Sequence, residues 1–136
     1  MRTLVVDTDV VSFIFNRHSL SEAYLKIVED KELVISFMTL AELHLGMMKA
    51  SWGQPRRAQL EKYLDQYGVC FPDETMCVVW AQVMLDFRRG GRAMSPQDAW
   101  IAATALYLQV PLITHNAKDF EGIPGLEIQT AYLTPS

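Results

Sequence analysis

The residues best suited to chemistry in this chain are acids that follow or open its predicted elements. Asp7 ends a buried strand predicted over residues 3–6, and Asp9 lies two residues further on. A strand of this kind delivers its terminal acid to the carboxyl edge of a parallel sheet, where open α/β folds bind ligands. We therefore interpret Asp7 as functional. We interpret Asp9 as the cap of the helix that starts at Val10.

Glu42 and Asp98 are predicted to reach the same edge from helices. Glu42 lies in the first turn of a helix predicted from Thr39, soon after a second strand. Asp98 lies in the first turn of a helix predicted to run from Ser95–Pro96 to about Leu108. Since a helix that precedes a strand runs antiparallel to it, the start of this helix also lies at the carboxyl edge.

The last predicted strand, residues 110–114, contributes the remaining polar side chains. Asn116 and Asp119 follow it directly. Carboxylates gathered at one place repel each other, and a hard cation removes that penalty. Oxygen ligands without cysteine or histidine are typical of Mg²⁺ or Mn²⁺ sites, which support phosphodiester hydrolysis.

Simpler explanations exist for several of these acids. Thr39-x-x-Glu42 and Ser95-x-x-Asp98 both match the capping box, in which the acid only satisfies a backbone donor. Asp119 could be an ordinary turn residue. Capping does not predict that all these acids share one edge, so their joint position favours a functional site.

The elements that must position these residues alternate along the chain. Short apolar segments, predicted as strands, are separated by amphipathic segments, predicted as helices: 3–6, 33–36, 69–71, 110–114 and 126–128 are the strands. This alternation predicts an α/β fold, a three-layer sandwich with a mostly parallel central sheet of four to five strands and helices on both faces. We expect residues 1–136 to form a single domain.

Composition excludes several classes of protein. The chain has 136 residues, half of them apolar, and a net charge of −4, which argues against a basic protein that coats nucleic acids. No segment approaches the roughly 20 apolar residues that span a bilayer, and no secretory leader is recognisable. The two cysteines, Cys70 and Cys77, have no zinc-site spacing and are typical of a reducing compartment. We therefore expect a cytoplasmic protein without a membrane partner.

The ordered set of motifs resembles the PIN domain, and more narrowly the VapC ribonuclease toxins of bacterial toxin–antitoxin pairs. The set comprises the strand ending in Asp7, Thr39-Leu-Ala-Glu42-Leu, Asp98-Ala-Trp-Ile-Ala-Ala and Leu112-Ile-Thr-His-Asn-Ala-Lys-Asp-Phe120. The resemblance covers nearly the whole chain. It implies a sheet between helices, an acidic metal pocket and Mg²⁺- or Mn²⁺-dependent cleavage of RNA. It also implies a homodimer that is inhibited by a cognate VapB-type antitoxin.

The resemblance also implies roles for individual residues. Asp7, Glu42 and Asp98 would be the metal-site acids, with Asp7 and Asp98 as the main ligands and Glu42 acting on the attacking water. The family's fourth acid is replaced here by Asn116, which brings no charge, and Asp119 is near enough to substitute for it. Thr114 resembles the family's hydroxyl residue that orients water or an acid.

A few residues near these motifs have more than one interpretation. Arg88, Arg89 and Arg92 precede Asp98 and could bind RNA phosphates, although cations that complement a helix C-terminus are the simpler explanation. His115 adjoins the proposed pocket and could touch substrate. The cluster of Met47, Met48 and Trp52 could be core or, if exposed, a surface for an antitoxin helix or a dimer partner.

Two other functions fit part of the pattern. Asp7-Thr-Asp9 after a buried strand resembles the paired aspartates of haloacid-dehalogenase-like phosphatases, with Asp7 as nucleophile, but that reading leaves Glu42 and Asp98 unexplained. A binding module that kept the PIN fold and lost cleavage is the non-enzymatic alternative, and the asparagine at position 116 is the feature that favours it.

Overall fold

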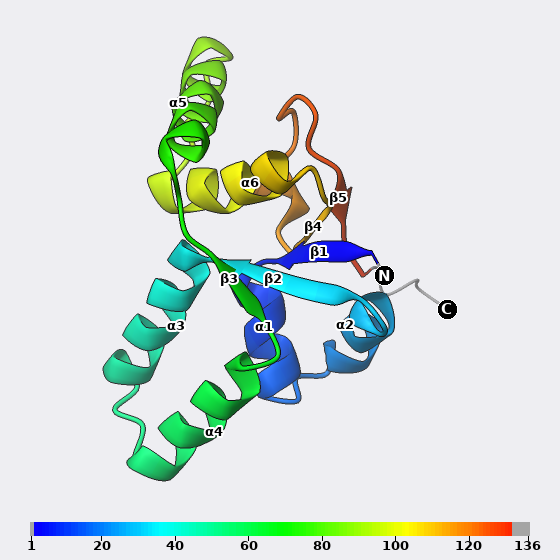
Figure 1. The fold of residues 1–136 in the computed structure, drawn as a ribbon, viewed down its shortest axis with the longest axis vertical. Coiled ribbons are helices and arrows are strands. Elements are labelled where there is room, and N and C mark those ends of the chain that lie inside the picture. Colours follow the sequence, from blue (N-terminus) through cyan, green and yellow to red (C-terminus); the bar gives the residue numbers. More distant parts are fainter. Residues whose placement is uncertain (1, 132–136) are drawn as a thin grey trace.

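A five-stranded parallel sheet lies between two layers of helices in the computed structural model, which describes residues 2–131 (Figure 1). The elements in chain order are β1 (Thr3–Val6), α1 (Thr8–Phe15), α2 (Ser21–Val28), β2 (Glu32–Ser36), α3 (Phe37–Lys49), α4 (Gln54–Leu64), β3 (Gly68–Cys70), α5 (Glu74–Arg89), α6 (Pro96–Leu108), β4 (Leu112–Ile113), the 3₁₀ turn η1 (Ala117–Asp119) and β5 (Ile128–Gln129). The predicted fold class is confirmed. Across this part of the chain the helices are too short or too polar to cross a membrane.

The strand order is β3-β2-β1-β4-β5, so the chain leaves the central strand β1 towards both sides of the sheet. Val5 of β1 pairs in parallel with Val34 of β2 on one side and with Leu112 of β4 on the other. In open α/β sheets, ligands bind outside the carboxyl ends of the strands at this reversal of strand order. The strand order therefore predicts a ligand site beyond the carboxyl ends of β1 and β4, where Asp7 and Thr114 lie.

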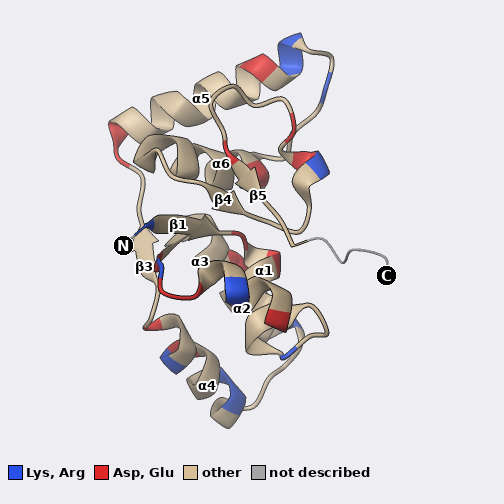
Figure 2. Cartoon of the chain, turned by 90° about the vertical axis from the view of Figure 1, so that its right-hand side faces the viewer, with Lys and Arg blue, Asp and Glu red and all other residues tan. Residues whose placement is uncertain are grey.

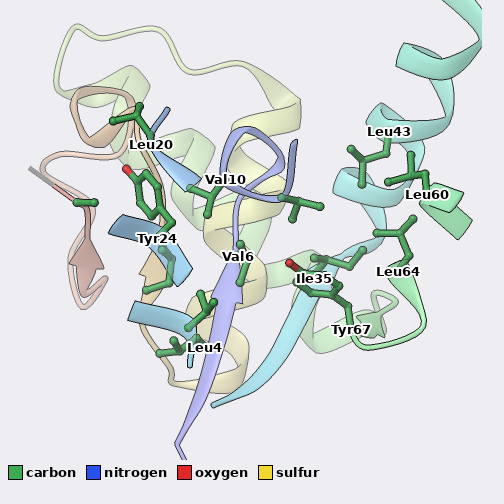
Figure 3. Packing of buried hydrophobic residues seen from close by; sticks show 14 of the residues in the cluster. Leu4, Val6, Val10, Leu20, Tyr24, Ile35, Leu43, Leu60, Leu64 and Tyr67 are labelled. Atoms are coloured by element: carbon green, nitrogen blue, oxygen red, sulfur yellow. The ribbon is translucent and has the colours of Figure 1, made fainter. Parts of the chain in front are cut away.

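Both faces of β1 are buried, which explains why its sequence is continuously apolar rather than alternating. Leu4 and Val6 point into the layer of α1–α4, where they join Tyr24, Ile35 and other residues of one apolar cluster (Figure 3). Val5 points to the opposite layer, formed by α5 and α6. Because β1 is held from both sides, the residue at its carboxyl end has a well-defined position.

Helix α6 packs closely on the sheet through small side chains. Its buried alanines are Ala99, Ala102, Ala103 and Ala105. Its first turn is capped by Ser95, whose Oγ accepts the backbone N–H of Asp98 at 3.1 Å, with Pro96 at the first helical position. The cap and the alanine face together fix the start of α6 and the position of Asp98.

Several element boundaries differ from the sequence-based prediction. Helix α3 begins at Phe37 rather than Thr39, because Ser36 Oγ accepts the N–H of Met38 and caps it. Strand β4 is limited to Leu112–Ile113 within the predicted 110–114. The last strand is Ile128–Gln129 rather than 126–128, since it pairs with Leu112 and Ile113.

Candidate active site

Asp7 is almost fully buried, with 6% of its surface exposed, and both of its carboxylate oxygens are engaged. Oδ1 accepts the backbone N–H of Thr8 at 2.7 Å, and Oδ2 accepts the hydroxyl of Thr114 at 2.7 Å. Asp7 is therefore the N-cap of α1. The interpretation that Asp9 caps this helix is wrong, because the chain turns into the helix immediately after β1.

Asp9 instead ties the loop after β4 to the start of α1. One oxygen, Oδ1, accepts the N–H of Val10. The other, Oδ2, accepts the backbone N–H of His115 at 3.1 Å and the side-chain amide of Asn116 at 3.0 Å. The amide nitrogen of Asn116 is thus held by a carboxylate, and its carbonyl oxygen is the atom that could face a cation.

Glu42 is linked to the site through Thr8, a residue that the sequence analysis did not single out. The hydroxyl of Thr8 lies 2.9 Å from both the Thr39 hydroxyl and Glu42 Oε1. Because Ser36 caps α3, Glu42 lies in the second turn and has no capping role. Its predicted place in the first turn is wrong. The only sequence signal for Thr8 was its position between two aspartates.

The charges of Asp9 and Asp98 raise the pKa values of neighbouring carboxyls, so these acids lie in a common region. Burial, followed by the charges of Asp9 and Asp98, raises the pKa of Asp7 to about 7, against the hydrogen bonds from Thr114 and Thr8. Burial also raises the pKa of Glu42, and the charges of Asp98 and Asp9 add to this effect. Asp98 thus acts on carboxyls that come from two other elements.

Asp9 and Asp98 follow the same pattern. Burial raises the pKa of Asp9, and the charge of Asp98 contributes in the same direction. Burial raises the pKa of Asp98 itself, with a further contribution from the charge of Asp119. Asp119, in η1, therefore lies on the Asp98 side of the region. The structure brings Asp7, Asp9, Glu42, Asp98 and Asp119 to the same edge of the sheet.

The donor set suits a hard divalent cation. Its side-chain atoms are oxygens from carboxylates. Burial first, and the neighbouring negative charges second, raise their pKa values, so their ionised forms are unfavourable there without a cation. Among residues 2–131, however, no group of three or more acidic, histidine or cysteine side chains is placed to hold a metal ion by itself. A cation bound here would need water or substrate oxygens in its shell, which is common for Mg²⁺.

Thr114 is completely buried and bonded to Asp7. Its Oγ1 also accepts the N–H of Asn116 at 3.0 Å. Thr114 therefore orients an acid, the role that the resemblance implies, and its buried side chain has no surface for RNA to contact. Thr114 orients the Asp7 carboxylate and the following loop together.

The three arginines differ in their surroundings. The guanidinium of Arg92 donates to the carbonyl oxygen of Glu121 at 2.6 Å and lies over the Phe87 ring at 4.5 Å, so it anchors the η1 loop. Arg88 and Arg89 form the last turn of α5. In Figure 2 that basic turn lies at the end of the molecule away from α1. Phosphate binding by these arginines stays a prediction.

The fold and this acidic edge define an α/β protein with an acid site at the central strand, and comparison with known proteins gives the family. The PIN domain model matches residues 4–126, so the chain belongs to the PIN-domain family. Ribonuclease VapC5 of Mycobacterium tuberculosis is 30% identical over 124 residues, 89% of this chain and 87% of that protein. The family membership therefore extends to its VapC branch.

Two further relatives span nearly the full length. Ribonuclease VapC1 of Haemophilus influenzae is 28% identical over 127 residues, 92% of this chain and 95% of that protein. A DNA-bound VapBC complex from Salmonella typhimurium contains a chain that is 25% identical. It superimposes with a TM-score of 0.84 over 97% of this chain and all of that one.

Proposed function

We propose that this chain is a metal-dependent endoribonuclease that acts as the toxin of a VapBC-type toxin–antitoxin pair in the cytoplasm. The observation that carries the proposal is the gathering of carboxylates at the carboxyl edge of the sheet. Asp7 is bonded there to Thr114 and Thr8, Glu42 is bonded to the same Thr8, and the charge of Asp98 raises the pKa of both acids. Membership of the PIN family and the ribonuclease names of the VapC relatives support it.

Asp7 and Asp98 are the main candidate ligands of Mg²⁺, with Mn²⁺ as a substitute. When bound, the cation supplies Lewis-acid polarisation of the scissile phosphate and of a water molecule. Asp7 is oriented for this by Thr114 and Thr8. Asn116 and Asp119 complete the outer part of the site, on the side of Asp98 and Asp9.

Glu42 is the candidate for taking the proton of the attacking water. Burial raises its pKa, so its carboxylate is a better base than an exposed glutamate. The hydroxyl of Thr8 holds one of its oxygens at 2.9 Å and leaves the other oxygen to act. Because Thr8 directly follows Asp7 in the chain, its hydrogen bond links the candidate base Glu42 to the candidate ligand Asp7.

The test is cleavage of total bacterial RNA by purified protein, with and without Mg²⁺ or Mn²⁺, followed by mapping of new 5′ ends. Asp7→Asn and Asp98→Asn should each abolish cleavage, and chelation of the metal should have the same effect. Glu61→Gln, an exposed acid on α4, is the matched control and should cleave like the wild type. Cleavage that survives both site substitutions would overturn the metal mechanism. RNA binding without cleavage would favour the inactive binding module.

The cognate antitoxin has a candidate surface beside the acids. A pocket of about 160 Å³ between α1, α3 and α4 has an apolar lining that includes Phe15, Met47 and Trp52, and it extends to Thr8 and Glu42. Elsewhere on α3, outside this lining, Met48 is 63% exposed and Leu45 is 57% exposed. Of the predicted methionine cluster, Met47 is core and Met48 is surface. We assign this groove to an apolar segment of the VapB-type antitoxin.

Co-purification with the antitoxin encoded beside this gene tests that assignment. Gly46→Trp adds a side chain to the pocket lining, where a Cβ at position 46 meets open space, so it should fill the groove and weaken the complex. Met48→Glu together with Leu45→Lys, outside that lining, is the control and should leave the complex intact. Sedimentation of the purified toxin tests the accompanying proposal of a homodimer. An undiminished complex with Gly46→Trp would move the antitoxin to another face.

A further inference from the structure

The imidazole of His115 is exposed at the rim of the acidic site, yet it is held by a buried tyrosine. Tyr24 is fully buried, and Figure 3 shows its ring within the apolar cluster near Leu20. Its hydroxyl lies 2.6 Å from His115 Nδ1 and 3.1 Å from Thr130 Oγ1. The rings of Phe13 and Tyr24 contact the imidazole edge-on, at 5.5 and 5.7 Å between centroids. The imidazole is therefore fixed in orientation.

The hydrogen bond from Tyr24 decides which ring nitrogen carries the proton. A phenol is a more acidic donor than an imidazole N–H, and an imidazole nitrogen is a better acceptor than a phenol oxygen. The Tyr24 hydroxyl accordingly donates to Nδ1 and accepts from Thr130. In neutral His115 the proton is then on Nε2, which has no hydrogen-bond partner within residues 2–131.

His115, which carries this Nε2–H group, lies beside the acids. His115 directly follows Thr114, and its backbone N–H donates to Asp9 Oδ2. Its side chain lines a surface cavity of about 390 Å³ together with Asn116, Lys118 and Thr130. The backbone N–H of His115 and the side-chain amide of Asn116 already hold this loop to Asp9. The contact between Tyr24 and His115 is therefore not needed to attach the loop.

We infer that His115 binds substrate by donating its Nε2–H to a nonbridging oxygen of an RNA phosphate next to the scissile linkage. This inference rests on the proposed ribonuclease function. An edge lined by carboxylates repels the phosphates that flank the cleaved one, so fixed donors at its rim are required. Arg92 does not supply one, because its guanidinium already holds the η1 loop. Lys118 lines the same cavity and brings a positive charge to it, beside the acids Asp119 and Glu121.

Two amide substitutions separate substrate binding from a structural role. In His115→Asn the amide occupies the place of Nδ1 and keeps a partner for Tyr24, but it has no donor at the place of Nε2. In His115→Gln the amide reaches the place of Nε2 instead. A substrate contact predicts that His115→Asn raises KM about tenfold with kcat within about twofold, and that His115→Gln restores most of the affinity. If His115 acts only through its contact with Tyr24, His115→Gln should have the higher KM and His115→Asn should remain close to the wild type.

Changing the substrate identifies the phosphate concerned. In an RNA oligonucleotide with one uncharged methylphosphonate linkage, moved stepwise along the strand, one position beside the cleaved bond should weaken the wild type. The same position should have little effect on His115→Asn, because the contact is already lost. The site of this loss would define the register of the RNA on the loop.

The outcomes distinguish the inference from the function on which it rests. If the wild type cleaves no RNA under the metal conditions above, the proposed function fails. If it cleaves and His115→Asn has an unchanged KM, or loses kcat alone, the inference is overturned. Thermal unfolding of both variants accompanies the kinetics. Should His115→Asn fail to fold, the inference still predicts wild-type KM for His115→Gln and a raised KM for His115→Leu, and equal values overturn it.

Discussion

The hydroxyl of Thr114 donates a 2.7 Å hydrogen bond to Oδ2 of Asp7, joining two residues that are 107 positions apart in sequence. They follow β4 and β1, the adjacent strands at which the strand order reverses. Both side chains are buried, so water cannot replace this bond. The orientation of the central carboxylate therefore depends on the pairing of two strands and on the residue that follows each of them.

Replacing Thr114 by valine keeps the shape of the side chain and removes this bond. The Asp7 carboxylate and the N–H of Asn116 both lose a partner, which should cost about 1–3 kcal/mol in the free energy of unfolding. Because the bond from Thr114 lowers the pKa of Asp7, that pKa should rise further. We expect RNA cleavage to fall roughly 10–100-fold, as for other residues that orient metal ligands. Thr114→Ser should keep most of the activity. Equal rates for the valine and serine variants would contradict the positioning role.

The raised pKa of Asp7 predicts that the metal-free chain loses stability as pH rises. Between the ordinary carboxyl pKa of 3.8 and about 7, the folded state keeps a proton that the unfolded state has released. The free energy of unfolding should therefore decrease across this window, by at most a few kcal/mol from Asp7, roughly 1.4 per pKa unit. Asp9, Glu42 and Asp98 act in the same direction.

Urea denaturation at pH 5 and pH 8 in the presence of a chelator measures this effect. Asp7→Asn should flatten the decrease, because an asparagine does not ionise, and should make the chain more stable than the wild type at pH 8. Mg²⁺ should recover stability at pH 8 for the wild type but much less for Asp7→Asn. A wild-type chain that gains stability from pH 5 to pH 8 without metal would refute the prediction.

Glu42 and Thr8 should have unequal importance for cleavage. Glu42→Gln removes the candidate base, so single-turnover cleavage should fall about 100-fold or more. Thr8→Val removes only the hydroxyl that lies 2.9 Å from Glu42, and its effect should be about tenfold or less. Because burial opposes ionisation of Glu42, the glutamine variant should be at least as stable as the wild type without metal. A larger loss for Thr8→Val than for Glu42→Gln would argue against Glu42 as the base.

Asp9 is expected to matter for the order of the loop after β4. Asp9→Asn leaves one carbonyl oxygen to accept from Val10, His115 and Asn116, which now use both carboxylate oxygens. Amide hydrogen exchange over residues 115–119 should become faster, while exchange in β1 and α6 stays slow. Cleavage should decrease with the loop. Unchanged protection of the loop would show that Asp9 is not its anchor.

Much of the fold could be predicted because each element carries a local signal. The apolar residues of β1 and the Ser95–Pro96 start of α6 depend on neighbours in sequence, and the structure has both. The predicted start of α3 was wrong because two residues could each cap that helix. Thr39 and Ser36 are both possible caps, and the pairing of β2 with β3 through Ser36 decides in favour of the earlier residue.

Residue types and the order of strands and helices were enough to predict the main acids and the edge of the sheet at which they lie. The function of each acid depends on contacts that form only in the folded chain. Asp7 caps α1, and Asp9 accepts from the loop after β4. Thr8 links Asp7 to Glu42. Tyr24 holds the ring of His115, which lies 91 positions away in sequence. Hydrogen bonds depend on distances of a few tenths of an ångström between residues remote in sequence. Periodicity and composition carry no information about such distances, which arise only when the strands pair and the helices pack.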